Sequence, residues 1–420
     1  MRRIVLAAAV AAAACFPAAA AAAPPAPGKP RATDITDRTV TLTWAKSEGS
    51  LRGYRVIRDG KIVRQLNQTQ VKISNLAPKK TYSWTVRAVD TDGNVGPASP
   101  AARVTQADPP PTTGSVHAYL LASTDKSYAA FRKHYRQIGH VYPTFYDCNR
   151  KTAALESRHN ERIVRYAQDR KVKVLPRFNC QGTDVLTRIL GEPELRERWL
   201  DGIVEAVDDH GYDGVNIDFE AIRAEDRDKL TSFIAELSER LHDRGKLLSQ
   251  ALSAKRADQD PNHPRSEAFD YRELVKHLDV AFVMGWGLHW AGSAPGAQDD
   301  IAWVRQVADY VATLPQREKW VMGTMLYGMD WPHGGKGRAL HYDEIQSLAA
   351  ANGATPVYSA EKDSWLLSYK DASGVPHQLW FSDATNVAKR VDIARERGLG
   401  VGVWRLGQED ERIWAHASLG

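Results

Sequence analysis

The stretch GYDGVNIDFEAI, residues 211–222, decides the fold because its apolar and polar residues alternate. The alternating positions are Val215, Ile217 and Phe219 on the apolar side and Asn216, Asp218 and Glu220 on the polar side. A period of two is typical of a β-strand with one wet face. The stretch lies among helical and other strand-like segments that favour a parallel sheet, in which both faces are usually covered and strands are continuously apolar. A buried strand with two carboxylates and an amide on one side therefore needs an explanation.

Seven further segments predict strands, and charged helical stretches lie between them. They are SVHAYLLAS, GHVYPTFY, KVKVLPRFN, LLSQALSAK, DVAFVMGW, WVMGTMLYG and GVGVWRLG. Eight βα units within residues 115–420 predict an α/β fold, a (β/α)8 TIM barrel. The interval of about 332–399, between the seventh and eighth strands, contains SWLLSYKDASGVPHQLWFSD, which predicts a hairpin and hence a small α+β insertion.

A barrel explains the alternation. The apolar residues would pack outward on helices, while Asn216, Asp218 and Glu220 would point into the lumen near the C-terminal end of the strand, where barrel enzymes carry their chemistry. Side chains two residues apart on a strand lie about 7 Å from each other. We therefore expect Asp218 and Glu220 to face one substrate atom and to share a hydrogen-bond network.

The N-terminal part of the chain predicts a separate all-β domain over residues 24–105, so the protein is multidomain. TVTLTW and YSWTVRAVD are strand-like, and YRVIRDGKIVRQL predicts a hairpin around its Asp-Gly pair. Trp44, Leu76, Pro78 and Tyr82 resemble the pattern of a fibronectin type III sandwich, in which the tyrosine forms a corner between strands. Such a domain implies little about function, because it serves as a spacer, a binding module or a surface adaptor.

Two segments at the N-terminal side are not expected to belong to either domain. Residues 106–114 include three consecutive prolines and predict a stiff linker. Residues 1–23 have the charged start, short apolar run and small-residue end of a secretory signal peptide. This predicts a secreted protein, extracellular or associated with the cell wall, with a lipoprotein anchored through Cys15 as the alternative.

Composition excludes several classes of partner. The chain is 43% hydrophobic and 25% charged with a net charge of +5, and it has no Lys/Arg run with interleaved aromatics, so we expect no nucleic acid partner. The apolar leader is too short and too rich in alanine to favour a membrane span.

Without the leader two cysteines remain, Cys148 and Cys180, and in an oxidising compartment these predict one disulfide, with two buried thiols as the alternative. No zinc-type spacing is present, and we expect no metal and no cofactor.

The barrel segments resemble glycoside hydrolase family 18, whose fourth strand carries the pattern DxxDxDxE. Here the four positions are Asp213, Asn216, Asp218 and Glu220. VMGWGLHW stands where the sixth strand of the family carries MxYD, LYGMDW resembles the seventh-strand motif, and GVGVWRLG supplies an eighth-strand tryptophan at Trp404. GVNIDFE is most similar to bacterial members that act on spore cortex or peptidoglycan as N-acetylglucosaminidases.

The resemblance assigns roles to the catalytic residues. Glu220 would protonate the glycosidic oxygen as general acid. The substrate's own acetamido oxygen would be the nucleophile, since this family departs from the two-carboxylate scheme. Asp218 would orient the acetamido N–H and stabilise the oxazolinium ion, and Asn216 would donate a hydrogen bond beneath it without adding a like charge.

Further residues are assigned to substrate binding. Trp404 would form an apolar floor for the sugar. Trp286 stands where the family has tyrosine, and Gly287 where it has aspartate, with His289 or Asp330 as candidates to compensate. 

Four further positions have competing or structural interpretations. Tyr327, like the later Trp331, would either form a wall of the cleft or pack within the barrel. Met284 is assigned to substrate binding, with core packing as the alternative. Asp213 breaks the inward parity of the strand and is expected to support the strand or its turn.

The leading hypothesis is a secreted glycosidase that cleaves β-1,4 bonds at N-acetylglucosamine units with retention of configuration, acting on peptidoglycan first and chitin-like glycans second. A carbohydrate-binding, lectin-like barrel with weak or no catalysis is the alternative. A third hypothesis makes the sandwich the functional part, as an adhesion module. In the leading hypothesis the sandwich would contact the cell wall or polymer.

Overall fold

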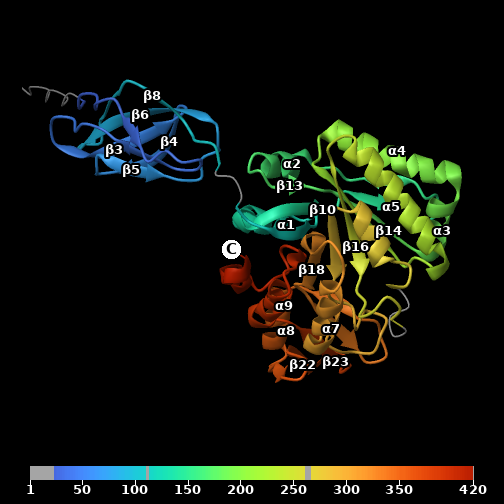
Figure 1. Cartoon of the computed structure of the whole chain (residues 1–420). Coiled ribbons are helices and arrows are strands. Elements are labelled where there is room, and N and C mark those ends of the chain that lie inside the picture. Colours follow the sequence, from blue (N-terminus) through green and yellow to red (C-terminus); the bar gives the residue numbers. More distant parts are fainter. Residues whose placement is uncertain (1–22, 110–112, 261–265, 420) are drawn as a thin grey trace, which may run out of the picture. The chain divides into compact units, whose positions relative to one another are not determined.

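The computed structural model describes residues 23–109, 113–260 and 266–419 (Figure 1). Residues 1–22 of the predicted leader, including Cys15, and residues 110–112 of the predicted linker lie outside these ranges. The chain divides into two compact units, Met1–Pro110 and Pro111–Gly420, which are described separately below.

The first unit consists of two antiparallel sheets. Its strands are β1 (Arg31–Thr33), β2 (Val40–Thr43), β3 (Leu51–Arg58), β4 (Lys61–Leu66), β5 (Gln70–Ile73), β6 (Thr81–Asp90), β7 (Val95–Ala98) and β8 (Ala102–Thr105). One sheet has the order β1-β2-β5, and the other has the order β4-β3-β6-β7 with β8 also paired to β6. The turn between β3 and β4 places Asp59 and Gly60 at positive φ, 49° and 81°, as a tight hairpin requires.

The core of the first unit contains Trp44, Tyr54 and Trp84, all buried. The hydroxyl of Tyr82 accepts a hydrogen bond of 2.9 Å from the backbone N–H of Ala77. This contact ties the start of β6 to the segment before it, which is the corner expected from the sequence.

The second unit contains a sheet of parallel strands at the eight predicted positions. These are β9 (Val116–Leu120), β10 (Ile138–Pro143) with β11 (Tyr146–Cys148), β13 (Lys173–Val174) with β14 (Arg177–Gln181), β15 (Gly214–Glu220), β16 (Leu247–Ser253), β17 (Val280–Met284), β18 (Trp320–Met325) and β24 (Gly400–Trp404). Parallel pairing runs from β11 through β14, β15, β16, β17 and β18 to β24, and β24 pairs with β9, which pairs with β10. The edge strand β12 (Leu155–Ser157) pairs antiparallel with β11.

Helices lie outside this sheet (Figure 1). They are α1 (Asp125–His134), α2 (Glu161–Gln168), α3 (Thr183–Gly191), α4 (Pro193–His210), α5 (Arg227–His242), α6 (Tyr271–His277), α7 (Ile301–Ala312), α8 (Tyr342–Ala351) and α9 (Ala384–Glu396). Helix α4 ends at Gly211, whose φ of 62° lets the chain reverse before β15. None of the helices in the described part of the chain is both long and apolar enough to cross a membrane.

A second sheet lies between β18 and β24 in the sequence. Its strands are β19 (Gly328–Pro332), β20 (Arg338–Leu340), β21 (Val357–Ser359), β22 (Ser364–Lys370) and β23 (Pro376–Phe381), antiparallel in the order β20-β19-β23-β22-β21. Together with α8 these strands enclose a small core of their own. The sheet begins at residue 328, directly after β18, and helix α9 after it packs on β18 and β24.

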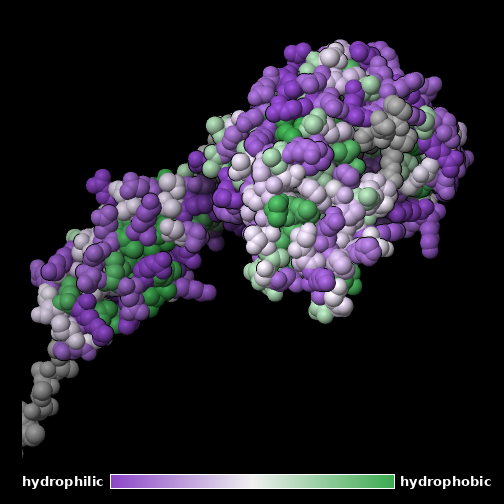
Figure 2. Space-filling model, turned by 90° about the horizontal axis from the view of Figure 1, so that it is seen from below, coloured by the Kyte–Doolittle hydropathy of each residue, from purple (hydrophilic) through white to green (hydrophobic). Residues whose placement is uncertain are grey.

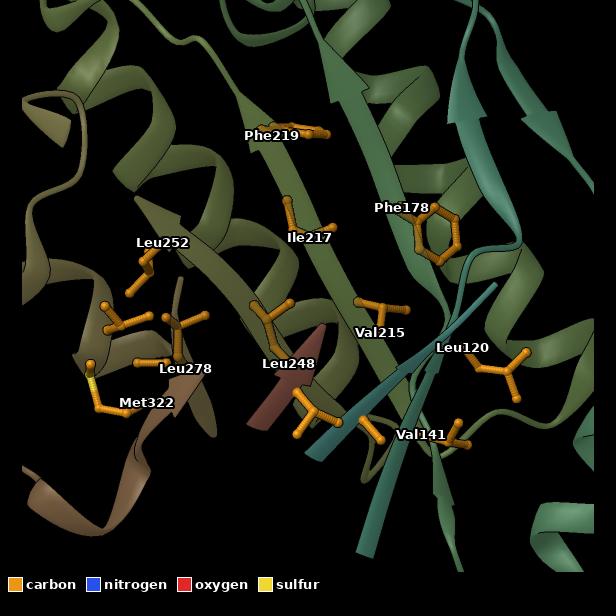
Figure 3. Close-up of a cluster of buried hydrophobic side chains, with 14 of the residues drawn as sticks. Leu120, Val141, Phe178, Val215, Ile217, Phe219, Leu248, Leu252, Leu278 and Met322 are labelled. Atoms are coloured by element: carbon orange, nitrogen blue, oxygen red, sulfur yellow. The ribbon is translucent and has the colours of Figure 1, made fainter. Parts of the chain in front are cut away.

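The apolar side of β15 faces the helices. Val215, Ile217 and Phe219 are fully buried among other apolar side chains (Figure 3), and the ring of Phe219 lies 5.5 Å from that of Trp199 in α4. The polar face of β15 therefore lies on the other side of the sheet, away from the helices. The face of the second unit seen in Figure 2 is largely hydrophilic, with some apolar patches.

Candidate active site

The polar residues of β15 lie at increasing exposure along the strand. Asn216 is fully buried, Asp218 is 3% exposed and Glu220, the last residue of the strand, is half-buried. All three face inward, opposite to the apolar residues that contact the helices. The strand thus presents its two carboxylates at the C-terminal end, where barrel enzymes carry their chemistry.

Asn216 does not donate to Asp218, contrary to the sequence expectation. Its side-chain N–H donates to the hydroxyl of Ser249 at 2.9 Å, and its oxygen accepts from the hydroxyl of Tyr119 at 2.8 Å. Ser249 lies directly opposite Asn216 on the neighbouring strand β16, about 5 Å away, whereas residues two apart on a strand are about 7 Å apart. Asn216 therefore joins β15 to β16 and to Tyr119 of β9.

Asp218 is held by an arginine from the neighbouring strand. Arg177 of β14 donates at 3.2 Å to one carboxylate oxygen of Asp218, and at 3.2 Å to Asp147 of β11. The guanidinium is 5.5 Å from the ring of Trp404. The other carboxylate oxygen of Asp218, Oδ1, is buried and has no hydrogen-bond partner among the described residues. That oxygen is available as an acceptor.

Burial raises the pKa of Asp218 above its usual value, and the nearby charge of Asp147 adds to this effect. The positive charge and hydrogen bond of Arg177 act in the opposite direction. Arg177 therefore favours the ionised form of this carboxyl group, against the effect of burial.

Glu220 is oriented by the same neighbouring strand. The side-chain amide of Gln181 donates to Glu220 Oε1 at 2.7 Å. The pairing of β14 with β15 sets Gln181 directly opposite Glu220, whereas Arg177 lies opposite Asn216 and bonds Asp218, two residues further along β15.

A pocket of about 140 Å³ joins the two carboxylates to aromatic side chains. Its lining residues are Tyr119, Asp218, Glu220, Met284, Trp286 and Trp404. Five of these six were expected at the site from the sequence, and Met284, at the end of β17, lines the pocket rather than being wholly packed in the core. Tyr119 was not foreseen. Its ring lies 5.0 Å from that of Trp404.

Tyr327, the residue before β19, lies near the site without lining this pocket. Burial raises the pKa of its hydroxyl, and the charges of Asp299 and Glu220 add to the shift. Trp331 is almost fully buried, and it lines a different pocket beside β19.

The proposed compensation for Gly287 is not seen for Asp330. That carboxylate accepts from the Tyr369 hydroxyl at 2.8 Å and lies 2.9 Å from Nδ1 of His377, both in the insertion sheet. His289 contacts the backbone oxygen of Ala294 at 3.0 Å. Gly287 itself has a φ of 95°, a backbone conformation that residues other than glycine rarely adopt.

Asp213 supports the start of β15. Its carboxylate accepts from the backbone N–H of Val174 at 2.9 Å and from Lys173 Nζ at 2.9 Å. It therefore fastens β15 to β13 at the end of the strand remote from Glu220.

Several residues that shape the site were missed in the sequence. Arg177, Asn179 and Gln181 alternate with Phe178 and Cys180 in RFNCQ, which is the same period of two that was recognised in β15. This alternation was the available signal. Tyr119 lies in VHAYL, where it and His117 alternate with apolar residues, so the same signal was present there, whereas Asp147 had none.

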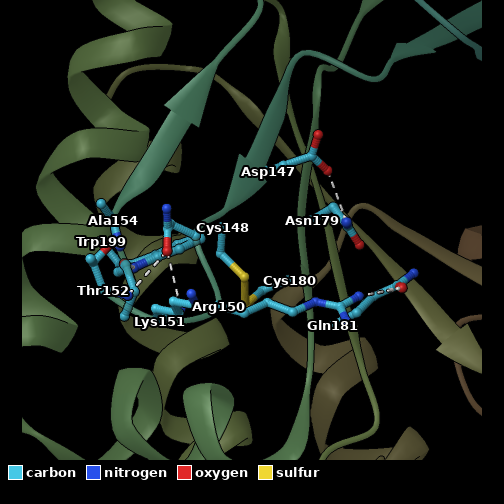
Figure 4. The surroundings of a disulfide bond; sticks show 12 residues. Asp147, Cys148, Arg150, Lys151, Thr152, Ala154, Asn179, Cys180, Gln181 and Trp199 are labelled. Atoms are coloured by element: carbon cyan, nitrogen blue, oxygen red, sulfur yellow. Dashed lines mark hydrogen bonds between the residues drawn. A yellow bond between two sulfur atoms is a disulfide. The ribbon is translucent and has the colours of Figure 1, made fainter.

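Cys148 and Cys180 form a disulfide beside the site (Figure 4). Cys148 follows Asp147, and Cys180 lies between Asn179 and Gln181. The side chain of Asn179 donates to Asp147 at 2.9 Å. The covalent bond and this hydrogen bond both join β11 to β14, the two strands that carry the support for Asp218.

The described residues include no group of three or more His, Cys, Asp or Glu side chains placed to hold a metal ion.

Comparison with known proteins agrees with this geometry. Residues 118–409 match "Glycosyl hydrolases family 18", and residues 25–105 match "Fibronectin type III domain". The crystal structure of a chitinase from Chromobacterium violaceum has a TM-score of 0.65 and 25% identity, covering 73% of this chain and 98% of that one.

Two curated proteins of Bacillus subtilis are also similar. YdhD, named as a glycosylase, is 34% identical over 230 residues, 53% of this chain and 54% of that protein. The cortical fragment-lytic enzyme is 31% identical over 239 residues, 55% of each. The matched region thus spans about half the length of these relatives. With a family match over most of the chain and a TIM-barrel-type arrangement of strands, the protein belongs to glycosyl hydrolase family 18, with a fibronectin type III domain before the hydrolase region.

Proposed function

We propose that the protein hydrolyses β-1,4 glycosidic bonds at N-acetylglucosamine units, by a retaining mechanism in which the substrate takes part. The observation that carries the proposal is that Asp218, whose buried Oδ1 lacks a partner among the described residues, lines one pocket with Glu220. An acetamido N–H is a donor that would satisfy this oxygen.

Glu220 would transfer its proton to the glycosidic oxygen as the bond to the anomeric carbon breaks. The acetamido oxygen of the same sugar would attack that carbon, giving a cyclic oxazolinium ion and a free hydroxyl on the departing glycan. Water would then add to the anomeric carbon, with Glu220 taking back a proton. Two displacements at one carbon retain its configuration.

Asp218 would stabilise the positive charge of the oxazolinium ion while its Oδ1 accepts from the acetamido nitrogen. This role needs an ionised carboxylate, which burial opposes and Arg177 favours. Trp404 and Trp286 would provide apolar faces for the sugar ring, and Asn216 would hold the strand in register through Ser249 and Tyr119.

Peptidoglycan is the first substrate class we propose, and chitin-like glycan is the second. The names of the similar proteins, a cortical fragment-lytic enzyme and a chitinase, correspond to these two classes. We also propose secretion to the cell exterior or cell wall, with a role for the fibronectin type III domain in contacting the wall or polymer.

The test is product analysis by mass spectrometry after incubating purified protein with peptidoglycan and, separately, with chitin oligomers. We expect fragments that end in reducing N-acetylglucosamine, and a loss of about 10²- to 10⁴-fold in rate for Glu220→Gln because the general acid is removed. Glu225→Gln, an exposed position in the following turn, is the matched control and should keep the activity.

The alternative of a lectin-like barrel predicts a different result. Wild type and Glu220→Gln would then bind the glycan equally, and neither would release fragments. A first-formed product with inverted anomeric configuration, detected by proton NMR, would contradict the retaining mechanism even if hydrolysis occurred.

A further inference from the structure

The fibronectin type III domain is strongly basic, and the rest of the chain after it is acidic. Residues 25–105 contain 14 lysines and arginines and 6 aspartates and glutamates, a net charge of +8, whereas residues 106–420 have a net charge of −5. The excess is concentrated in the sheet formed by β3, β4, β6, β7 and β8. These strands carry seven basic residues and one acidic residue: Arg52, Arg55, Arg58, Lys61, Arg64, Arg87, Arg103 and Asp90. Such an imbalance attracts polyanions.

Three of these arginines lie on the face of the sheet that points away from the core. The inward positions of β3, β6 and β8 are filled by buried residues, among them Tyr54, Val56, Trp84, Val86, Ala102 and Val104. Successive side chains of a strand point to opposite faces, so the residues between these point outward. They include Arg55 and Arg87, which are half-buried, and Arg103, which is exposed. We call the surface of these three residues the arginine face.

Two residues of the arginine face form a like-charged pair. Arg55 and Arg87 stand directly opposite each other in the pairing of β3 with β6. Residues in this relation have Cβ atoms about 4.5–5.5 Å apart, and like charges there are destabilising. Neither guanidinium has an acidic partner within ion-pairing distance in the described part of the chain. Arg87 Nε donates at 2.7 Å to the backbone oxygen of Gly96, while Arg55 Nε is buried with no hydrogen-bond partner among the described residues. An anion bound from outside would neutralise both charges.

The spacing of the charges indicates an extended ligand. Arg103 stands opposite Ser83 in the pairing of β8 with β6, four residues before Arg87. Because a strand rises about 3.3 Å per residue, the third arginine lies about 13 Å along the sheet from the opposed pair. One small anion cannot reach all three, whereas a linear polymer with repeated charges can.

The type of charge favours phosphate. Six of the seven basic residues in these strands are arginines, and a planar guanidinium matches the geometry of phosphate oxygens. A phosphodiester is ionised throughout the neutral pH range and presents two charged oxygens, one for each guanidinium of the opposed pair.

The arginine face has no surface for stacking. The aromatic residues of its strands are Tyr54, Tyr82 and Trp84, and all three are buried in the core. Single-stranded nucleic acids bind by stacking bases on exposed aromatic side chains, and a neutral glycan offers no charge to the arginines. The affinity must therefore come from charge, which favours an anionic polymer over either of these.

We propose that the arginine face binds an anionic, phosphodiester-linked polymer of the cell wall and so holds the hydrolase region near its substrate. The inference rests on the proposed secretion to the wall, and it gives the fibronectin type III domain a binding surface and a class of partner. It does not depend on the catalytic chemistry, because neither Asp218 nor Glu220 takes part. Exposed charges are screened by salt, so this binding weakens as the ionic strength rises.

The experiment measures sedimentation of the purified protein with isolated bacterial cell walls that carry a phosphodiester polymer. The Glu220→Gln background keeps the wall from being digested. Part of the wall preparation is first treated with cold hydrofluoric acid, which cleaves phosphodiesters and leaves the peptidoglycan. We expect binding to untreated walls and much weaker binding to treated walls. Arg55→Gln with Arg87→Gln should weaken binding to untreated walls by about tenfold, through the loss of two exposed ionic contacts.

Arg31→Gln with Lys72→Gln is the matched control, because it removes the same charge from exposed positions of the other sheet. Thermal unfolding of each variant reports whether it is folded. Equal weakening by the two double variants overturns the arginine face, since net charge alone would then explain the binding. Equal binding to treated and untreated walls, or no binding to either, overturns the phosphodiester polymer as partner. Tighter binding to vesicles of phosphatidylglycerol than to untreated walls overturns it in favour of a membrane surface.

Failure of the proposed function would appear in a separate measurement, as absence of hydrolysis of a soluble amino-sugar oligomer by protein with Glu220 intact. In that assay Arg55→Gln with Arg87→Gln should keep the wild-type rate, because both residues lie outside the hydrolase region at 118–409.

Discussion

Removal of the Arg177 guanidinium should shift the acid side of the pH–rate profile. Arg177 donates at 3.2 Å to Asp218 and at 3.2 Å to Asp147, and it is 9% exposed. In Arg177→Met the side chain keeps its approximate length but loses the charge. Burial and the charge of Asp147, which both raise the pKa of Asp218, would then act without opposition.

The size of the shift follows from the type of contact. A neighbouring opposite charge changes a carboxyl pKa by about 1 to 3 units. Because the proposed mechanism requires ionised Asp218, we expect the acid limb of kcat/KM to move up by about 1 to 3 pH units. Each unit corresponds to about 1.4 kcal/mol of lost preference for the ionised form.

The assay is kcat/KM on a soluble amino-sugar oligomer across the pH range in which the protein stays folded. Arg177→Lys retains the charge but not the planar pair of donors, so its limb should move less. Arg158→Met is the matched control, since Arg158 donates to the other oxygen of Asp147 at 2.7 Å from an exposed position. If Arg177→Met is folded and its acid limb coincides with those of wild type and Arg158→Met, Arg177 does not set the ionisation of Asp218.

Two further predictions concern stability. Burial lowers the pKa of the His140 imidazole from 6.5 to about 4. The stabilisation that the folded state gains from the neutral ring is therefore complete above pH 6.5 and is lost as the pH falls toward 4. The free energy of unfolding should be about 2 kcal/mol lower at pH 5 than at pH 7. His140→Phe, which keeps a ring stacked on His117, should reduce that dependence in urea titrations, and an equal dependence in both proteins would refute the assignment. The disulfide closes a sequence separation of 32 residues, so Cys148→Ser with Cys180→Ser should lower the free energy of unfolding by about 4 kcal/mol. Equal urea midpoints for this double variant and the oxidised wild type would argue against that contribution.

The alternation in β15 predicted correctly which of its faces packs on the helices, because a period of two can be recognised in one chain without knowledge of its neighbours. The supporting groups could not be predicted in this way. That Arg177 reaches Asp218, and that Asn216 bonds Ser249 and Tyr119, depends on the register between strands, which no single segment encodes. The pattern RFNCQ indicates that Arg177, Asn179 and Gln181 share one face of the strand, but it does not indicate which side chains they contact.

The register between β14 and β15 has an evolutionary consequence. In these strands the residues that build the hydrophobic layer and those proposed for chemistry occupy alternate positions of one backbone. Loss or gain of one residue within β15 would turn Ile217 inward and Asp218 toward the helices, so stability and activity would fail in the same event. Single substitutions can change the polar face of β15 one residue at a time, whereas an insertion or deletion within this strand disrupts both faces at once. Variation in length is instead open to the loop after β17 and to the insertion between β18 and β24, because neither carries the alternation of β15.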